Sequence, residues 1–419
     1  MLHPKMVPVR QRFERPRVED IAGTIRGELE RISVGQQIRP GQTVALTAGS
    51  RGIANIPLIL KTVAEVLKKL GAKPFLVPTM GSHGGGIAEG QRQILEDYGI
   101  TEAFVGAPIR ASMETVSLGN SADGYPVVID RHAAEADHIG VVARVKPHTG
   151  YQGPIESGLL KMMMIGLGKH AGALICHRIL LDEPFDKVVR SVSRTIRARA
   201  PIAFGLALVE NAYDEIARIE AVRPAEFEPR EEALLVLAKR WLARLPFHNA
   251  DLLIIDEIGK DISGSGMDTN IVGRKRTFRA QASANGQPTM RHIFVRGLTE
   301  RTHGNAAGIG LADFTTTRLV RSMDYQATII NCLTAGYPEG ANLPVHFETD
   351  REVIDAALAI IGNRPPEEAH ILRIRNTLAV EEVAVSEPCL AQGKPDTDLS
   401  RVGDPQALAF DASGNLGRL

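Results

Sequence analysis

The chain has 419 residues, of which 44% are hydrophobic and 23% charged, the usual mixture for a globular protein of two or three domains. Its 49 basic and 49 acidic side chains give no net charge, which argues against a broad surface for binding nucleic acid or an anionic membrane. No apolar stretch reaches the roughly 18 residues of a membrane span, and the first residues lack the apolar run of a secretory signal. The three cysteines form no close pair, so we expect a cytoplasmic protein with reduced thiols.

Strand and helix patterns alternate along the first 245 residues. We expect buried strands at 43–46, 74–78, 139–145 and 203–209. We expect helices at 56–70, from the glycine-rich turn after the second strand to about residue 98, and at 231–245. The first two strands end in glycine-containing turns. This alternation predicts βαβ units and a mainly parallel sheet.

A second α/β series follows a boundary near residues 246–249. We expect strands at 250–256, 292–295 and 370–375, with helices at about 308–334 and 350–362. The prediction is an α/β fold of two domains with mainly parallel sheets. Residues 1–247 form a catalytic, cofactor-binding domain and 248–390 a second domain, with the active site in a cleft between them. Residues 391–419 are expected to form a loose tail.

Polar residues gather where three predicted strands end, which is where open α/β sheets bind ligands. The three turns are Ser50-Arg51-Gly52, Gly81-Ser82-His83-Gly84-Gly85 and Lys146-Pro147-His148-Thr149-Gly150. An arginine can grip a carboxylate or phosphate with two hydrogen bonds, and two histidines can supply a base and an acid near neutral pH. The alternatives are a surface ion pair for Arg51 and loop-stabilising hydrogen bonds for each histidine.

Lys161 stands in an apolar, methionine-rich stretch from residue 158 to 172. It either reaches out to solvent or is desolvated, in which case its pKa falls and it becomes nucleophilic. The methionines are expected to fill the core rather than bind metal. His177 adds a third imidazole to His83 and His148, and imidazole suits nickel, zinc, copper or iron, although the spacing matches no compact zinc motif.

The second half offers a glycine-rich loop at 259–270, followed by Arg274, Lys275 and Arg276, which are positioned in sequence to close on an anionic substrate. The alternative is a solvated basic turn. The chain has no GxxxxGK[ST] phosphate loop, no GxSxG motif and no GxGxxG fingerprint. The turn at Gly84-Gly85-Gly86 can still receive a phosphate at the start of a helix.

In their order along the chain, these landmarks resemble the nickel-dependent lactate racemase family. The likeness runs through most of the chain: the arginine turn, the Gly-Ser-His turn, Pro147-His148, the glycine-flanked lysine followed by His177, and Asp268-Thr269-Asn270-Ile271 in place of an Asp-x-Asn-Ile segment. The resemblance implies a nickel pincer nucleotide (pyridinium-3-thioamide-5-thiocarboxylic acid mononucleotide carrying nickel).

The same resemblance implies a role for each landmark. Lys161 would be joined to the cofactor, with Ser50, Arg51, Gly84 and Gly85 beside it, and His177 would be the protein's nickel ligand. His83 and His148 would be the acid/base pair, and Arg51, Lys275 and Arg276 would contact substrate. The implied activity is an isomerase reaction, racemisation or epimerisation of a small 2-hydroxy acid by reversible hydride transfer to the cofactor.

The sequence departs from the family at two places. Gly158-Leu159-Leu160-Lys161 replaces a Gly-Gly-Arg-Lys pattern, and Gly273 and Arg276 stand where lactate racemases have glutamine and lysine. These differences favour another hydroxy acid, such as a sugar acid or a dicarboxylate, at least as much as lactate. Two other functions stay open: a zinc or iron hydrolase or lyase that uses the three histidines, and a non-catalytic binding protein for an anionic metabolite. We expect no nucleic-acid or membrane partner and leave homo-oligomerisation open.

Overall fold

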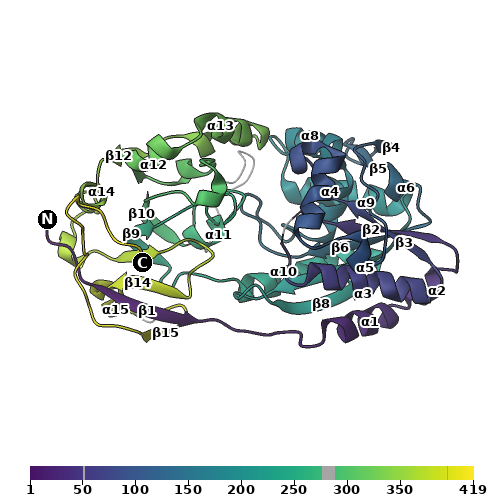
Figure 1. Cartoon of the computed structure of the whole chain (residues 1–419), viewed down its shortest axis with the longest axis horizontal. Helices are drawn as coiled ribbons and strands as arrows, with labels where there is room; N and C mark the ends of the chain where they lie inside the picture. The colour runs from purple at the N-terminus through teal and green to yellow at the C-terminus, as the bar shows by residue number, and fades with distance from the viewer. Residues whose placement is uncertain (51, 276–287, 394) are drawn as a thin grey trace. The chain divides into compact units, whose positions relative to one another are not determined.

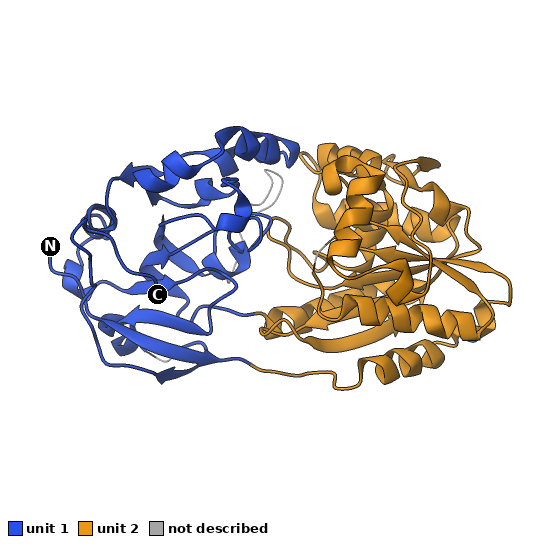
Figure 2. Cartoon of the chain, in the orientation of Figure 1, with its two compact units in different colours: residues 1–13, 243–276, 283–419 blue, residues 14–242, 277–282 orange. Residues whose placement is uncertain are grey.

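The computed structural model describes residues 1–50, 52–275, 288–393 and 395–419. Backbone contacts divide these residues into two compact units (Figure 2). Unit 2 comprises residues 14–242, and unit 1 comprises residues 1–13, 243–275 and 288–419. The change of unit at residue 242 lies five residues before the predicted boundary.

Unit 2 is built on a five-stranded sheet in the order β3-β2-β6-β7-β8 (Figure 1). Its strands are β2 (Thr43–Ala48), β3 (Lys73–Pro78), β6 (His138–Arg144), β7 (Ile202–Glu210) and β8 (Ile216–Val222). The first four are parallel, and β8 is antiparallel to β7. The predicted α/β class with a mainly parallel sheet is therefore confirmed.

Helices cover both faces of this sheet, and its strands are therefore buried on both sides. One apolar core includes side chains of α1 (Ile21–Arg31), α2 (Val34–Gln37), α3 (Ile56–Lys69), α4 (Ala88–Asp97) and α5 (Glu102–Val105). The other includes side chains of the β4–β5 hairpin (Thr115–Asn120 and Pro126–Asp130), α6 (Arg131–Ala134), α7 (Leu159–Lys161), the π-helix η2 (Met162–Leu167), α8 (Lys169–Ile179), α9 (Phe185–Arg199) and α10 (Phe227–Trp241). The helix predicted at 231–245 begins four residues earlier, because Phe227 is fully buried in this core.

Unit 1 holds an eight-stranded sheet in the order β12-β11-β10-β9-β13-β14-β1-β15. Its strands are β1 (Met6–Arg12), β9 (Asn249–Ile255), β10 (Thr289–Val295), β11 (Phe314–Thr316), β12 (Val345–Phe347), β13 (Ile371–Ile374), β14 (Glu382–Ser386) and β15 (Asp398–Arg401). The five from β12 to β13 are parallel, and the other three pair antiparallel.

The helices of unit 1 are α11 (Thr269–Val272), α12 (Thr317–Ser322), α13 (Tyr325–Thr334), α14 (Asp350–Leu358) and α15 (Glu387–Ala391). The helical segment predicted at about 308–334 is confirmed only in part, because α12 and α13 lie in it but β11 interrupts it. The hydroxyls of Thr315 and Thr316 there donate to the carbonyls of Val295 and Arg296, and β-branched residues favour a strand.

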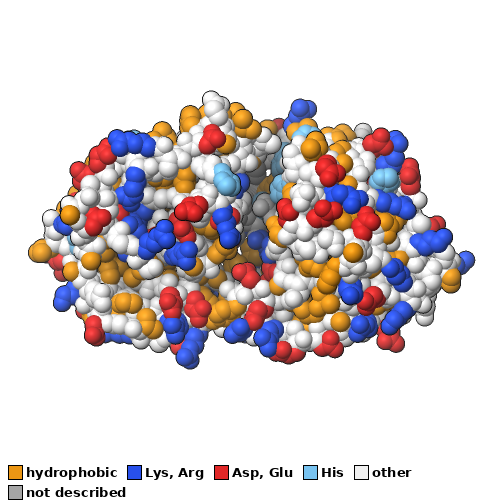
Figure 3. Space-filling view, viewed as in Figure 1, with side chains coloured by type: hydrophobic (Ala, Val, Ile, Leu, Met, Phe, Trp, Pro, Cys, Tyr) orange, Lys and Arg blue, Asp and Glu red, His pale blue; other side chains and the backbone are white. Residues whose placement is uncertain are grey.

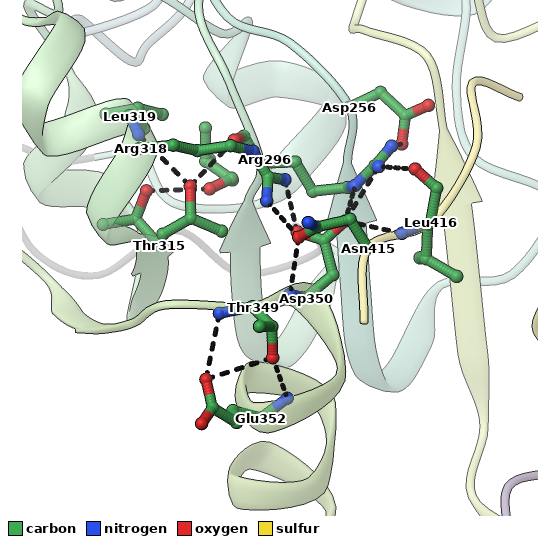
Figure 4. Close-up of polar contacts among 12 residues, drawn as sticks. Asp256, Arg296, Thr315, Arg318, Leu319, Thr349, Asp350, Glu352, Asn415 and Leu416 are labelled. Carbon is green, nitrogen blue, oxygen red and sulfur yellow. Dashed lines mark hydrogen bonds and ion pairs between the residues drawn. The ribbon is translucent and has the colours of Figure 1, made fainter. Parts of the chain in front are cut away.

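Both ends of the chain differ from the predicted division. Residues 1–13 join unit 1 because β1 pairs with β14 and β15 and buries Val7 and Val9 completely. The segment expected to be a loose tail contributes β15 and is tied to the sheet (Figure 4). There Asp350 accepts a hydrogen bond from the amide of Leu416 at 2.9 Å and pairs with the buried Arg296 at 2.8 Å.

Acidic and basic side chains are interspersed on the face of the molecule shown in Figure 3. Among the described residues, no single helix is long and apolar enough to cross a membrane. The bent pair Leu159–Leu167 and Lys169–Ile179, with 112° between its parts, reaches that length and composition only when both halves are counted. The predicted cleft between the two domains stays a prediction.

Candidate functional site

Three of the predicted site residues follow parallel strands of the unit 2 sheet. Ser50 comes after β2, His83 after β3 and His148 after β6, and β2 lies between the other two strands. Because parallel strands have their carboxyl ends at one edge, these loops share that edge of the sheet. This is the edge at which α/β sheets bind ligands.

The π-helix η2, which directly follows Lys161, packs against two of these loops. A Cβ atom built on Gly49 would lie 3.2 Å from Met162, and one built on Gly81 would lie 3.3 Å from Ile165. The absence of side chains at these glycines therefore lets the segment that carries Lys161 approach the ends of β2 and β3. Single π turns within helices are frequent at functional sites.

A hydrogen bond joins the first two loops. The Ser50 hydroxyl and His83 Nδ1 lie 2.5 Å apart. Gln91 is a fully buried residue of α4, and its side-chain amide donates to the carbonyls of Gly81 at 2.9 Å and of His83 at 3.2 Å. The His83 loop is thus held from both sides.

A buried lysine supports Gln91, and it is not the lysine that the sequence singled out. Lys169 is fully buried, and its Nζ donates to Gln91 at 3.0 Å and to the carbonyl of Pro78 at 2.7 Å, 3.5 Å from Asp130. Burial lowers the pKa of Lys169 and raises that of Asp130, and their mutual attraction offsets part of both shifts. Lys161, by contrast, is only partly buried.

Gly84, Gly85 and Gly86 form a left-handed turn directly after His83, with φ angles of 65°, 69° and 67°. Glycine is required at the first position, because a Cβ atom there would lie 2.6 Å from the backbone of Gly90. A Cβ atom on Gly85 would meet nothing within 4 Å. The backbone at Gly85 is therefore open to a ligand.

The loop after β6 is braced by a carboxylate that the sequence did not reveal. Glu156 is fully buried, and its two oxygens accept hydrogen bonds from the amides of His148 at 2.8 Å and Gly153 at 3.4 Å. Lys239 lies 2.6 Å from the same carboxylate. The ring of His148 bonds back to this loop, because its Nδ1 accepts from the amides of Gly150 and Tyr151, both at 3.0 Å.

Tyr151 links His148 to Lys161. Its ring is stacked between those of His148, with centroids 4.2 Å apart, and Phe185, at 4.1 Å. Lys161 Nζ lies 5.4 Å from the centroid of the Tyr151 ring, within the range of a cation–π interaction. The structure therefore brings His148 and Lys161 to the same side chain.

His177, on α8, is close enough to Lys161 to feel its charge. Burial and that charge both lower the pKa of His177, so the ring is neutral near pH 7 and can bind a metal. Its Nδ1 is buried without a hydrogen-bond partner. The neighbouring Cys176 is not a competing ligand in this state, because burial raises the pKa of its thiol to about 12.

The buried His177 nitrogen has no hydrogen-bond partner and lies near enough to Lys161 to feel its charge. This arrangement fits a cofactor that is attached to a lysine and whose metal takes one ligand from the protein. In the described parts of the chain, no three His, Cys, Asp or Glu side chains gather as a metal site. The described geometry therefore gives no support to the zinc or iron site predicted from His83, His148 and His177.

Glu231, a second residue that the sequence did not reveal, caps the helix that carries Lys161. Its carboxylate is fully buried and accepts from the amide of Leu160 at 3.0 Å, while its other oxygen has no partner. Burial raises the pKa of Glu231 to about 7. Gly158 makes room for it, since a Cβ atom there would lie 2.5 Å from the carboxyl carbon.

Of the three predicted substrate-binding residues, only Lys275 lies among the described residues. Arg51 and Arg276 lie outside the described residues, and the partly buried Lys275 belongs to unit 1. Arg274 beside it has a structural role, since its guanidinium forms two hydrogen bonds to Asp313 at 2.5 and 3.0 Å. Asp268 caps the short helix α11 by accepting from the amide of Asn270.

A search of solved structures finds a chain with the same fold. The structure of the lactate racemase apoprotein from Thermoanaerobacterium thermosaccharolyticum superposes with a TM-score of 0.52 at 14% identity. The match covers 88% of this chain and 94% of that one. No family model and no curated protein sequence matches the chain. The likeness therefore shows the fold.

Proposed function

We propose that this protein is a racemase or epimerase of a 2-hydroxy acid that uses a lysine-bound nickel pincer nucleotide. The observation that carries the proposal is the grouping of Lys161 with His177 and with the His148–Tyr151 stack at the carboxyl edge of the sheet. The fold similarity to a lactate racemase apoprotein supports it independently.

In this proposal, Lys161 is the attachment point and His177 the single protein ligand of the nickel. When bound, the nucleotide would supply a position that accepts hydride reversibly from the α-carbon of the substrate. The turn at Gly84–Gly86, with its open backbone at Gly85, would receive the phosphate of the nucleotide together with Ser50 and Arg51.

The chain's own residues would bind the substrate and handle its hydroxyl proton. His83 and His148 are the acid/base candidates, and their loops are held by Ser50, Gln91 and Glu156. Arg51, Lys275 and Arg276 would attract the carboxylate. The sequence differences near Lys161 and after Asp268 favour a hydroxy acid other than lactate at least as much as lactate itself.

Intact-mass measurement of the protein, co-expressed with enzymes that make the cofactor, tests the proposal. We expect an adduct on the wild-type chain that is absent from Lys161→Ala and present on the matched control Lys187→Ala, an exposed lysine of α9. The His177→Ala variant should keep the organic adduct and lose nickel, which metal analysis would show. Turnover of a hydroxy acid by unmodified, nickel-free protein would refute the mechanism.

A further inference from the structure

The sheet of unit 1 changes direction between β9 and β13. The chain lays down β9, β10, β11 and β12 in order toward one edge and then crosses back to place β13 on the other side of β9. Open α/β sheets bind ligands outside the carboxyl ends of the strands at such a switch point, because the loops on its two sides leave in opposite directions. A ligand of unit 1 is therefore expected at the carboxyl ends of β9 and β13.

Charged side chains gather at this switch point. Asp256 directly follows β9, Arg296 directly follows β10, and Arg373 lies one residue before the end of β13. Nε and Nη2 of Arg373 donate to the two oxygens of Asp256, each at 2.9 Å, and Arg296 lies 2.8 Å from the same carboxylate. Arg296 also pairs with Asp350 (Figure 4). The two arginines are only 7% and 8% exposed, so their guanidinium groups are held inside the fold.

The remaining partners of these two arginines come from the C-terminal segment, residues 411–419. Arg296 donates to the successive carbonyls of Leu416 and Gly417, the latter at 3.2 Å, and Arg373 donates to the carbonyl of Gly417 as well. One neutral oxygen thus receives donors from two guanidinium groups. The two carbonyl oxygens stand where two oxygens of a carboxylate or phosphate group would accept from an arginine.

Positive side chains outnumber negative ones in this cluster. Arg318 is a third cation, which pairs with Asp350 and donates to the side-chain oxygen of Asn415. The three arginines share the two carboxylates of Asp256 and Asp350, while the acceptors that the segment gives to them are neutral carbonyl and amide oxygens. Hydrogen bonds to an ionised acceptor are roughly twice as strong as those to a neutral one. An anionic ligand would therefore bind these arginines more strongly than the segment does.

The C-terminal segment is attached mainly through one apolar side chain. Of residues 411–419, Leu416 alone is buried, in the apolar core that includes Phe294. The turn before it is held by its own contacts, because Asp411 accepts from the amides of Ser413 and Asn415 at 2.8 and 2.9 Å. The segment can therefore detach as a unit once Leu416 leaves the core.

We propose that Arg296 and Arg373 form an oxyanion-binding site at the switch point of unit 1, for a small ligand that carries a carboxylate or phosphate group. The C-terminal segment occupies the site in this structure and competes with the ligand for it. The residues proposed for the cofactor and for acid/base chemistry lie in unit 2. This second site therefore stands or falls separately from the proposed racemase or epimerase activity.

Competition can be tested in the full chain by weakening the segment. Leu416→Ala leaves the partners of both arginines in place and removes the buried anchor. Calorimetric titrations with malonate and, separately, with inorganic phosphate are run at constant ionic strength. We expect Leu416→Ala to bind at least one of these probes about tenfold or more tightly than the wild type, because the cost of the lost side chain falls on the occupied state alone. The probe that binds identifies the charged group that the site accepts.

A second substitution assigns the binding to the arginines. Adding Arg373→Met to Leu416→Ala should weaken the probe at least about tenfold, the loss typical of a hydrogen bond between charged groups. Arg375→Met is the matched control, since this exposed arginine near the same strand end pairs with Glu257, and it should leave the affinity unchanged. Absence of binding to both probes, or binding that Arg373→Met does not weaken, would overturn the proposal.

Hydrogen exchange gives a readout of the segment itself. The amide of Leu416 donates to Asp350 at 2.9 Å, and this bond is lost when the segment detaches. Saturating probe should therefore speed exchange at residue 416 of the Leu416→Ala variant, whereas sodium chloride at the same ionic strength should not. A chain that ends at Phe410 should bind the probe at least as tightly as Leu416→Ala, and a peptide of residues 409–419 should displace it. Unchanged exchange with the probe bound would show that the segment and the ligand do not compete.

Discussion

Individual buried side chains give this protein a pH dependence that can be predicted. The carboxyl of Glu231 has a pKa of about 7, above the value near 4.3 expected in the unfolded chain. Between these two values, the unfolded state loses its proton while the folded state keeps it. The free energy of unfolding must therefore fall as the pH rises through this window.

We expect the free energy of unfolding of the wild type, relative to Glu231→Gln, to fall by roughly 3 kcal/mol between about pH 4.5 and pH 7. Urea denaturation of both proteins at several pH values would measure this difference. Glu89→Gln, a change at an exposed glutamate of α4, serves as the control and should follow the wild type. If the free energies of unfolding of Glu231→Gln and the wild type changed with pH in parallel, Glu231 would titrate normally in the folded protein.

The same residues mark how far the sequence could predict the site. Ser50, His83 and His148 were found because they follow recognisable strands, and the pairing of Ser50 with His83 follows from the adjacency of β2 and β3. Glu156 and Glu231 escaped notice because a carboxylate on a helix or loop looks solvent-exposed in a sequence. Only the packing shows that each accepts backbone hydrogen bonds.

Lysine burial could not be read from composition either. Lys161 and Lys169 stand in the same apolar stretch, but the bend between η2 and α8 separates their environments. Lys169 has a φ of 56° and turns into the core, where a carbonyl, an amide oxygen and Asp130 surround its amine. No local pattern in the sequence indicates this backbone angle, which is rare for residues other than glycine.

At the scale of elements, Lys169 joins β3, α4 and the end of β5. We expect Lys169→Met to lower the free energy of unfolding by about 3–5 kcal/mol, because it leaves the buried Asp130 without its counter-charge. Adding Asp130→Asn should recover part of the loss, since the uncompensated charge is then removed. Thermal and urea denaturation would measure both effects.

The control for this experiment is Lys187→Met, which removes an exposed lysine paired with Glu183 on the protein surface. That variant should lose less than about 1 kcal/mol. If Lys169→Met were as stable as this control, the buried Lys169–Asp130 pair would contribute little to the stability of the fold.

The elements that could be predicted are those with strong periodicity. The parallel strands β2, β3, β6 and β7 are buried along most of their length, and α3 has one clear apolar face. Strand β1 was missed because its pairing with β14 connects residues about 375 positions apart (Met6 with Ser386, for example), which no local pattern encodes. The short β11 was missed within a segment that otherwise looks helical.

On the scale of the whole molecule, each apolar core is built from the residues of one unit. In the described chain, both cores that flank the five-stranded sheet lie within residues 14–242, and so do Ser50, His83, His148, Lys161 and His177. Unit 2 therefore carries its own cores together with most of the proposed site.

We expect a fragment of residues 14–242 to fold by itself, because it has a complete sheet with helices on both faces. Near-ultraviolet circular dichroism and dispersed amide resonances would show fixed packing, and the fragment should unfold cooperatively on heating. A fragment that binds hydrophobic dyes and lacks near-ultraviolet signal would contradict the expectation.

The position of β1 has a consequence for biosynthesis. This strand emerges from the ribosome before any of unit 2, yet its partner β14 is translated about 375 residues later. At typical rates of about 5–20 residues per second, the nascent strand waits roughly 20–75 s. During that time Val7 and Val9 have no sheet to cover them, so an unpaired apolar strand is exposed to aggregation until unit 1 is complete.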